Sequence, residues 1–576
     1  MEKYFGLHNH TMYSNIRLLD CINRPKDLID KAIELGLSGI AITDHECLSG
    51  HMEVNQYAQK IKEKHPDFKI ALGNEIYLVD ERISGIKYYH FILIAKDAIG
   101  HKALREMSSI AWYNSYVDRG MERVPITKSE LSDIMSRYRG HVIASTACMG
   151  GELSTAAYNM ALAEEVNDLI SAQQFYNQIC DFMSFCTNTF GEDFYIECAP
   201  STAEDQCQTN RKLYRIAQAY NIPMVVGTDA HYLTKDDRFV HKSYLNSKGG
   251  EREVDSFYEF AHLMTYEEVC DLLTKCFGDM SIAKTILYNS DRVKDKISDY
   301  SLERKQMIPK VDVKYYAPSS AWEWDCYPTL RYLLASDNDQ ERYWVNECLN
   351  KLAEMELDEN QEYAQRLEIE ADIIKFIGEK LDDCLFAYFN TFKHYIDLFW
   401  ECGSTVGPGR GSATGFLSNY LLGITQLDPI RWNLPYWRFL NKERAELPDI
   451  DIDLAPSKRP EIFRRIREER GELGLIQVAT FGTEGTKSAI LTACRGYRSE
   501  DCPDGIDVDV AQYMSSLIPQ ERGFLWSIKD VVEGNPDKDR KPVTTFIREV
   551  NNYPGLLNII KSIEGSKYTG PLYLFY

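Results

Sequence analysis

VGPGRGSATG, residues 406–415, is the stretch from which the second half of the chain can be interpreted. It places one proline and four glycines around Arg410 and Ser412. Glycine lets the backbone approach a ligand closely, and backbone N–H groups, a guanidinium and a hydroxyl together suit a phosphate. The stretch predicts a phosphate-binding loop of Gly409, Arg410, Gly411 and Ser412, and then a helix over residues 412–422 whose N-terminal dipole helps to bind the anion.

ELPDIDIDL, residues 446–454, alternates carboxylates with isoleucines. At strand period Asp449, Asp451 and Asp453 project from one face, while Ile450 and Ile452 enter the core. Crowded carboxylates repel one another unless a cation lies between them, and hard oxygen ligands suit Mg²⁺. A phosphate loop followed by a carboxylate strand predicts metal-assisted phosphoryl or nucleotidyl transfer. The simpler alternatives are an ordinary turn and a solvated strand face.

A second signal lies in LHNHTMYS, residues 7–14, after a short buried strand predicted over residues 4–7. His8 and His10, two positions apart on a strand, point the same way, which is metal-ligand spacing. A helix predicted over residues 25–35 leads to the strand GIAITDH, which ends in Asp44 and His45. Strand, helix and strand with polar groups at the strand ends is typical of a βα barrel, whose chemistry collects at one face.

The later predicted strands also carry polar side chains near their ends, namely Glu75, His90, Cys148, Asp229 and His231. Any one of these could be a satisfied core or surface residue. As a set they indicate an active site, because histidine, carboxylate and thiol groups repeat at the same structural position.

Four segments of the second half resemble the palm of the bacterial C-family DNA polymerases, the α subunits of DNA polymerase III: GPGRGSATG, LLGITQLDP, FLNKER and LPDIDID. The resemblance implies nucleotidyl transfer with Mg²⁺, with Asp451 and Asp453 as the catalytic pair and Asp449 beside them. It also implies that Lys487 and Arg495, on a helix after the TFGT element, meet the incoming nucleotide or the primer.

The first half resembles the PHP (polymerase and histidinol phosphatase) domain, a distorted seven-stranded βα barrel. The resemblance implies a centre of up to three metal ions with nine ligands, namely His8, His10, Asp20, His45, Glu75, His90, Cys148, Asp229 and His231. Mixed histidine, carboxylate and thiolate ligation suits Zn²⁺ or Mn²⁺. In this family such a centre is associated with 3′–5′ exonuclease activity.

The fold class expected is therefore α/β, with a PHP barrel over residues 1–300 and an α+β palm over residues 301–482. Residues 483–576 are expected to form a helical thumb and the start of the return to the palm. We find no sequence like KFDFLG, which carries the third palm carboxylate in this family, and no fingers. The chain is expected to be an incomplete polymerase that uses primed DNA and deoxynucleoside triphosphates. A second chain supplying fingers, a sliding clamp and other replisome subunits are the expected partners.

Two alternatives remain open at this point. One is a metal-dependent PHP phosphoesterase or nuclease whose palm-like half only docks DNA. The other is an assembly scaffold without catalysis. The basic residues between Lys458 and Arg470 fit either contact with a DNA backbone or a surface helix paired with its own glutamates.

Composition bounds these interpretations. The 576 residues exceed one ordinary domain, and 44% hydrophobic residues suffice for sizeable cores. A formal charge of −22 argues against a simple electrostatic binder of nucleic acid, although a local basic groove stays compatible with it. The fifteen cysteines form no paired C-x-x-C framework, and no run of 18 apolar residues occurs. A cytoplasmic protein without a membrane segment is expected.

Overall fold

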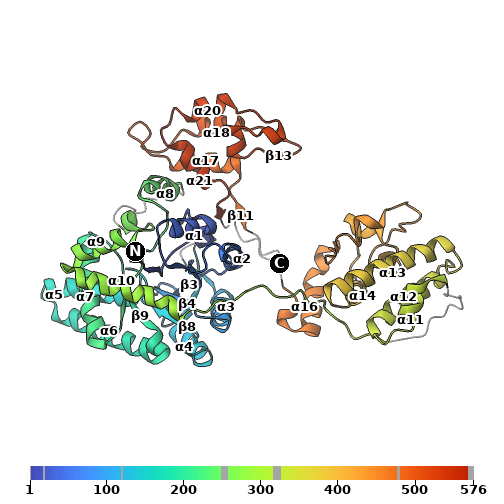
Figure 1. Ribbon diagram of the computed structural model, residues 1–576, viewed down its shortest axis with the longest axis horizontal. Coiled ribbons are helices and arrows are strands. Elements are labelled where there is room, and N and C mark those ends of the chain that lie inside the picture. The colour runs from blue at the N-terminus through green and yellow to red at the C-terminus, as the bar shows by residue number, and fades with distance from the viewer. Residues whose placement is uncertain are drawn as a thin grey trace. The chain divides into compact units, whose positions relative to one another are not determined.

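The computed structural model describes residues 2–16, 20–118, 121–247, 257–314, 326–476 and 481–568 (Figure 1). These residues form two compact units. The first unit extends to Glu303 and also includes residues 481–568, and the second unit covers residues 304–476. The second unit is thus inserted into the sequence of the first.

A mixed sheet forms the centre of the first unit. Seven strands pair in one path, β1-β2-β3-β4-β8-β9-β10, and β7 (Pro125–Thr127) pairs with the end of β3. Their bounds are Phe5–Gly6, Gly39–Ile42, Lys69–Val79, Tyr89–Ala95, Val142–Ser145, Phe194–Cys198 and Met224–Val226. Strand β4 runs antiparallel to both of its neighbours, and the other pairs in the path are parallel. A bridge between Asn9 and Ala230, just beyond β1 and β10, nearly closes the sheet into a barrel.

Helices cover this sheet, and their starts follow the local sequence. Pro25 begins α1, where a missing N–H costs nothing, and Thr127 forms a capping box with Glu130 at the start of α4. The strands GIAI and YHFILIA supply buried side chains to the core between sheet and helices. The covering helices are α1 (Pro25–Glu34), α2 (His51–Ile61), α3 (Ala98–Tyr113), α4 (Lys128–Arg137), α5 (Glu152–Glu165), α6 (Leu169–Phe190), α7 (Glu204–Tyr220), α9 (Tyr266–Phe277) and α10 (Met280–Val293).

Residues 481–568 form a small helical part of the same unit. Its core includes Val240 and Tyr244 from α8 (Arg238–Asn246), so this segment and the barrel share a packed interior. Strand β11 (Gly482–Thr483) pairs antiparallel with β14 (Lys567–Tyr568), which joins the two ends of the segment. The helices are α17 (Thr486–Gly496), α18 (Val508–Ser516), α19 (Ile528–Glu533), α20 (Thr544–Val550) and α21 (Leu556–Ile563).

The second unit is helical where the sequence predicts helices between residues 325 and 400. It contains α11 (Pro328–Leu334), α12 (Asp339–Glu354), α13 (Gln361–Leu381), α14 (Phe386–Glu401), α15 (Leu417–Leu421) and α16 (Arg459–Arg470). Phe386 and Phe389 of α14 are buried, and the ring of Phe386 lies 5.0 Å from that of Trp344. The aromatic residues of this helix mainly build the core, as predicted.

Two local predictions for this unit were wrong. The expected helix over residues 412–422 is a 3₁₀ turn, Gly411–Gly415, and then the short helix α15, because Phe416 between them is extended. Residues 449–453 alternate between exposed aspartates and more buried isoleucines as predicted, but they pair in no ladder within residues 326–476. A single antiparallel bridge joins Val406 to Leu454. Most of the strand expected over residues 476–481 lies outside the described residues.

Among the described residues, no helix has both the length and the apolar character that crossing a bilayer requires.

Candidate metal centre and glycine loop

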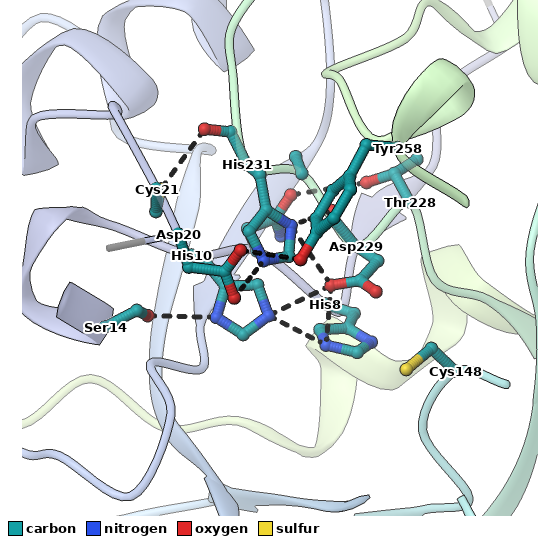
Figure 2. A network of polar contacts seen from close by, with 12 residues as sticks. His8, His10, Ser14, Asp20, Cys21, Cys148, Thr228, Asp229, His231 and Tyr258 are labelled. Carbon is teal, nitrogen blue, oxygen red and sulfur yellow. Dashed lines mark hydrogen bonds and ion pairs between the residues drawn. The ribbon is translucent and has the colours of Figure 1, made fainter. Parts of the chain in front are cut away.

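The strands of the first unit and the segments beside them bring the nine predicted ligands into one cluster, in which eight are buried and His90 is half-buried. Figure 2 shows six of them, namely His8, His10, Asp20, Cys148, Asp229 and His231. His8 and His10 follow β1, His45 follows β2, and Asp229 and His231 follow β10. Glu75 lies within β3, His90 within β4 and Cys148 after β8. Asp20 comes from the segment after the 3₁₀ turn Met12–Ile16. Strands that are far apart in sequence meet at one edge of a barrel, which explains the convergence.

Glu75 is a central residue of this cluster. Its Oε2 lies 2.6 Å from Nδ1 of His45, and its Oε1 lies 2.8 Å from Nδ1 of His90. The Nε2 atoms of His8 and His10 lie 3.5 Å and 3.4 Å from the same carboxylate. One carboxylate thus faces four imidazoles, an arrangement that can serve more than one metal ion.

Two further carboxylates complete the cluster. Oδ1 of Asp229 lies 3.0 Å from Nε2 of His10 and 3.3 Å from Nε2 of His8. Oδ2 of Asp20 lies 3.3 Å from Nε2 of His45 and 3.6 Å from Nε2 of His231. Sγ of Cys148 is 3.8 Å from Nδ1 of His90.

Four buried atoms of the cluster make no hydrogen bond, although each lies at ion-pair distance from another member of the cluster. They are Nδ1 of His45, Oε2 of Glu75, Oδ1 of Asp229 and Nε2 of His231. Buried polar atoms are almost always hydrogen-bonded, because leaving them without a partner is costly. Overlapping groups of three donors, such as His10, His45 and His231, lie within 4.8 Å of one another. Convergent nitrogen and oxygen atoms that lack hydrogen bonds fit divalent cations.

Burial and neighbouring charges act on the pKa values of the clustered histidines. Burial alone would lower the pKa of His8, but Asp229, Glu197 and Glu75 raise it well above its usual value. Burial, together with His45 and His231, lowers the pKa of His10 to about 3. The pKa values of two neighbouring imidazoles are therefore shifted in opposite directions, as expected where each ring faces different charges.

The pKa values of Glu75 and Cys148 are also shifted from their ordinary values. Burial would raise the pKa of Glu75, but His90, His45 and His8 hold it well below the ordinary range. Burial, with Asp229 and Glu75 nearby, raises the pKa of the Cys148 thiol well above its usual value. A bound cation would offset this shift, because it favours the thiolate.

Sequence reasoning missed the residues that orient these ligands. Oε1 of Glu197 lies 2.6 Å from Nδ1 of His8, and Oε2 of Glu197 accepts a hydrogen bond from Ser145 Oγ at 2.7 Å. Glu197 lies near the end of β9, in FYIEC, so an acidic residue at a predicted strand end was the available signal. Gly227 makes room for it, since a Cβ there would lie 1.9 Å from Glu197 Oε1.

Two other groups hold the ligand segments. Asp44 accepts hydrogen bonds from Ser14 Oγ at 2.7 Å and from the backbone of Thr11 at 2.6 Å, while Ser14 Oγ lies 3.0 Å from Nδ1 of His10. Tyr258 donates its hydroxyl to Oδ1 of Asp20 at 2.6 Å (Figure 2). A ring nitrogen of His241 lies 2.7 Å from the backbone oxygen of Asp20.

The glycine loop and the aspartates lie together in the second unit. Nη2 of Arg410 is 3.3 Å from Oδ1 of Asp451, and its Nε is 3.9 Å from Oδ1 of Asp453. A Cβ on Gly411 would lie 3.6 Å from Oδ2 of Asp451, so the loop backbone passes close to this carboxylate. Gly409 has φ +109°, which an L side chain rarely adopts. The structure thus joins Arg410 to two of the three aspartates.

A buried pair behind the loop was not foreseen. Glu370 is fully buried and accepts hydrogen bonds from the backbone N–H groups of Leu417 at 2.7 Å and Ser418 at 2.8 Å. Nε of Arg366 donates to the same carboxylate at 2.9 Å, and Nη2 of Arg366 donates to the carbonyl of Gly415 at 2.6 Å. These contacts fix the end of the glycine loop.

The remaining candidates fall elsewhere. Lys487 and Arg495 lie on α17, in the first unit, and Nη1 of Arg495 donates to the carbonyl of Ser247 at 3.3 Å. On α16, Arg464 pairs with Glu461 and Glu468, Arg465 with Glu401, and Arg470 with Glu469. The basic helix therefore has the ion pairs expected of a salt-bridged surface.

Comparison with known proteins identifies the parts of the chain. The model of the PHP domain matches residues 6–201, and that of the bacterial DNA polymerase III alpha NTPase domain matches residues 340–570. The probable DNA polymerase YorL of Bacillus subtilis is 40% identical over 97% of this chain and 44% of its own length. The DNA polymerase III subunit alpha of Aquifex aeolicus is 27% identical over 90% of this chain and 41% of its own length.

A solved structure from Bifidobacterium adolescentis, of a candidate metal-dependent phosphoesterase, covers 48% of this chain at 16% identity with a TM-score of 0.25. The chain spans less than half the length of the two curated polymerase relatives. Their family implies divalent metals, and the buried donor cluster is consistent with that. With both family models matched and a relative similar over nearly the whole chain, the protein belongs to the bacterial C-family DNA polymerases, the DNA polymerase III α family, and carries its PHP and palm regions.

Proposed function

We propose that this protein acts in DNA replication as a DNA polymerase of the DNA polymerase III α type, with a PHP centre that removes nucleotides from a 3′ end. In this proposal residues 1–300 are the PHP domain, residues 301–482 the palm, and residues 483–576 the thumb and the start of the return to the palm. Its substrates are primed DNA and deoxynucleoside triphosphates, its partners are replisome subunits, and its place is the cytoplasm.

One observation carries the nuclease half of the proposal. Eight buried donor side chains and the half-buried His90 meet in one cluster, and four of the buried atoms make no hydrogen bond. Zn²⁺ or Mn²⁺ bound there supplies activation of a water molecule and stabilisation of the oxygen that leaves a phosphodiester. A cavity of about 130 Å³, lined in part by Cys148, Asp229, Pro200 and Phe260, lies beside the cluster.

Neighbouring side chains orient the proposed metal ligands. Glu197 holds Nδ1 of His8, so Nε2 of that ring faces the other donors. Ser14 contacts Nδ1 of His10 in the same way, and Tyr258 positions Asp20. Because His8, His10 and Glu75 are fully buried, bulk water is kept from the donors.

The glycine loop and its aspartates support the polymerase half. Gly409, Arg410, Gly411 and Ser412 would bind the triphosphate, and Asp451 and Asp453 would hold Mg²⁺, with Asp449 beside them. The Arg410 guanidinium bridges the loop and both carboxylates. In this arrangement it orients the phosphate next to the metal-binding oxygens and offsets their charge. We also propose that Lys487 and Arg495 contact the nucleotide or the primer.

A specific observation favours a second candidate, a metal-dependent nuclease whose second unit only docks DNA. The side chains proposed as ligands of the first unit are mostly buried and already lie close together, whereas the side chains of Asp451 and Asp453 are 48% and 62% exposed. Exposed carboxylates hold a metal less firmly than buried ones. Under this alternative the protein would digest a 3′ end but would not extend a primer.

The two halves are tested separately on one purified protein. The His8→Ala, His10→Ala double variant should lose Mn²⁺- or Zn²⁺-dependent digestion of a 3′-labelled strand and retain primer extension. The Asp451→Asn variant should lose extension with Mg²⁺ and retain digestion. Full digestion by the double histidine variant would overturn the nuclease half, and the absence of extension by the unmodified protein would leave the second candidate.

A further inference from the structure

Residues 431–438 place two indole side chains and two guanidinium groups at the surface of the second unit. Trp432 is 63% exposed and Trp437 is 58% exposed. Arg431 and Arg438 are exposed as well, and the guanidinium carbon of Arg431 lies 5.9 Å from the centre of the Trp432 ring. We call these four residues the aromatic platform. Indoles left in water forgo the stabilisation that burial gives, so a pair of them in one short segment indicates a surface that binds a ligand.

The backbone under the aromatic platform is held in place. The Asp428 carboxylate accepts hydrogen bonds from the N–H groups of Ile430 at 2.9 Å and Arg431 at 3.2 Å. The N–H of Trp432 donates to the carbonyl of Asp428 at 3.2 Å, and that of Leu434 donates to the carbonyl of Pro429 at 2.8 Å. The exposed indole of Trp432 therefore stands on a fixed turn, and Trp437 lies in the 3₁₀ turn Tyr436–Arg438 that follows.

Arg366 connects this turn to the glycine loop. Its Nη2 donates to the carbonyl of Leu434 at 2.9 Å and to that of Gly415 at 2.6 Å. Its guanidinium also lies 4.9 Å from the ring centre of Tyr436. One guanidinium thus joins the segment of the aromatic platform to the loop proposed for the triphosphate. A strand bound on the platform would lie on the same rigid part of the unit as that loop.

The local charge is opposite to that of the whole chain. The chain carries a formal charge of −22, but residues 431–444 contain four basic residues and one acidic residue. Lys442 pairs with Asp372, and Arg444 pairs with Glu446. Arg431 and Arg438 form no ion pair with any residue that the structure describes. Cationic groups interleaved with exposed aromatic rings are typical of surfaces that bind single strands, because rings stack on bases and guanidinium groups bind phosphates.

We propose that the aromatic platform binds single-stranded DNA, with bases stacked on Trp432 and Trp437 and phosphates bound by Arg431 and Arg438. This assignment rests on the proposed function, because the single strand would be the unpaired part of a primed DNA substrate. Binding by stacking requires no catalysis, so it can be measured after metal ions have been removed from the proposed nuclease and polymerase sites.

The experiment uses the full chain, a fluorescently labelled dT12 oligonucleotide, EDTA and no nucleotide. Fluorescence anisotropy should show that Trp432→Ala and Trp437→Ala each weaken binding by about 5- to 100-fold, the range that base stacking supports. The matched control is Trp400→Ala, which removes an indole that is 46% exposed on α14 of the same unit, and it should leave affinity unchanged. Trp432→Phe and Trp437→Phe should retain most of the affinity, which separates stacking from misfolding.

A second readout concerns the arginines. Arg431→Gln, Arg438→Gln should reduce the dependence of dT12 affinity on salt concentration, because fewer counterions are then released. The proposal is overturned if the Trp432→Ala, Trp437→Ala double variant binds dT12 as tightly as Trp400→Ala does. It is also overturned if rU12 is bound and dT12 is not, or if the variants change the oligomeric state without changing DNA affinity. Since EDTA abolishes both metal-dependent activities, failure of primer extension or digestion leaves this result unaffected.

Discussion

Glu197 and His8 are 189 residues apart, yet Oε1 of Glu197 lies 2.6 Å from Nδ1 of His8 at the buried end of the barrel. The contact fixes which ring nitrogen of His8 faces the other donors. A carboxylate that orients a metal-binding histidine commonly influences metal affinity about 10- to 100-fold. Glu197→Gln is therefore expected to weaken Mn²⁺ binding by about that factor, as measured by isothermal titration.

The matched control for this substitution is Glu165→Gln, at the exposed end of α5. It changes the same functional group away from the cluster and should leave Mn²⁺ affinity unaltered. Equal affinities of Glu197→Gln and the unmodified protein would contradict the assigned role of Glu197.

Removal of divalent ions should destabilise the first unit. Its donors include four buried atoms without hydrogen bonds, and a bound cation would stabilise the folded state alone. At an ion concentration 100 times the dissociation constant, this contribution is about 2.7 kcal/mol. Thermal unfolding monitored with and without EDTA should show a lower transition temperature after chelation. The same comparison with His8→Ala, His10→Ala should show almost no effect of EDTA, and an undiminished effect there would place the stabilising ion elsewhere.

The buried pair behind the glycine loop should dominate the stability of the second unit. Arg366→Met would leave the Glu370 carboxylate buried beside the backbone of Leu417 without its cation. Loss of one partner of a buried pair costs about 3–5 kcal/mol. Urea unfolding should show this loss. The control is Lys375→Met, which removes an exposed pair with Glu379 on the same helix and should cost at most about 0.5 kcal/mol. Similar costs for both variants would refute the assignment.

A histidine pair away from the metal centre should make stability depend on pH. Nδ1 of His51 lies 3.0 Å from Nε2 of His101. Burial, and then His101, lowers the pKa of His51 to about 3, and burial, and then Arg105, lowers the pKa of His101 to about 4. The unfolded chain, with a pKa of about 6.5 for each imidazole, binds these protons first as the pH falls. Unfolding is therefore favoured progressively below about pH 6.5.

At pH 5 the His51 contribution alone should amount to a loss of about 2 kcal/mol relative to pH 7. Urea unfolding at the two pH values should show a smaller difference for His51→Gln, His101→Gln than for the unmodified protein. His65→Gln removes an exposed histidine of the same unit and should leave the pH difference as it was. A double variant with the full pH difference would assign the effect to other groups.

The cluster of metal ligands could be predicted because its evidence is local. Except for Asp20, which the family resemblance supplied, each predicted ligand lies in or close to a strand whose apolar run is visible in the sequence, and barrel strands deliver such residues to one face. Glu197 was missed because its importance depends on a partner from another strand, which a linear pattern does not reveal. The ligand roles of His8 and its neighbours, and the nucleotide contacts of Lys487 and Arg495, stay predictions.

In the second unit, local sequence patterns predicted burial correctly but did not predict strand pairing or the extent of a helix. Alternating burial of Ile450 and Ile452 follows from strand period alone, so it was predicted correctly. A ladder also needs a neighbouring strand, and among the described residues this segment has a single bridge, between Val406 and Leu454 just after it. The helix expected after Ser412 fails at Phe416, whose ring packs 4.8 Å from that of Phe439. Tertiary packing overrode helix propensity there.

The inserted position of residues 304–476 has a consequence for synthesis on the ribosome. The barrel strands emerge first, and the second unit follows with a core of its own. Residues 481–568, which complete the core around Tyr244, emerge last. During translation the second unit can therefore finish folding while the first still exposes part of α8 to solvent. The part of the protein that begins folding earliest is also the part that must wait longest for its final contacts.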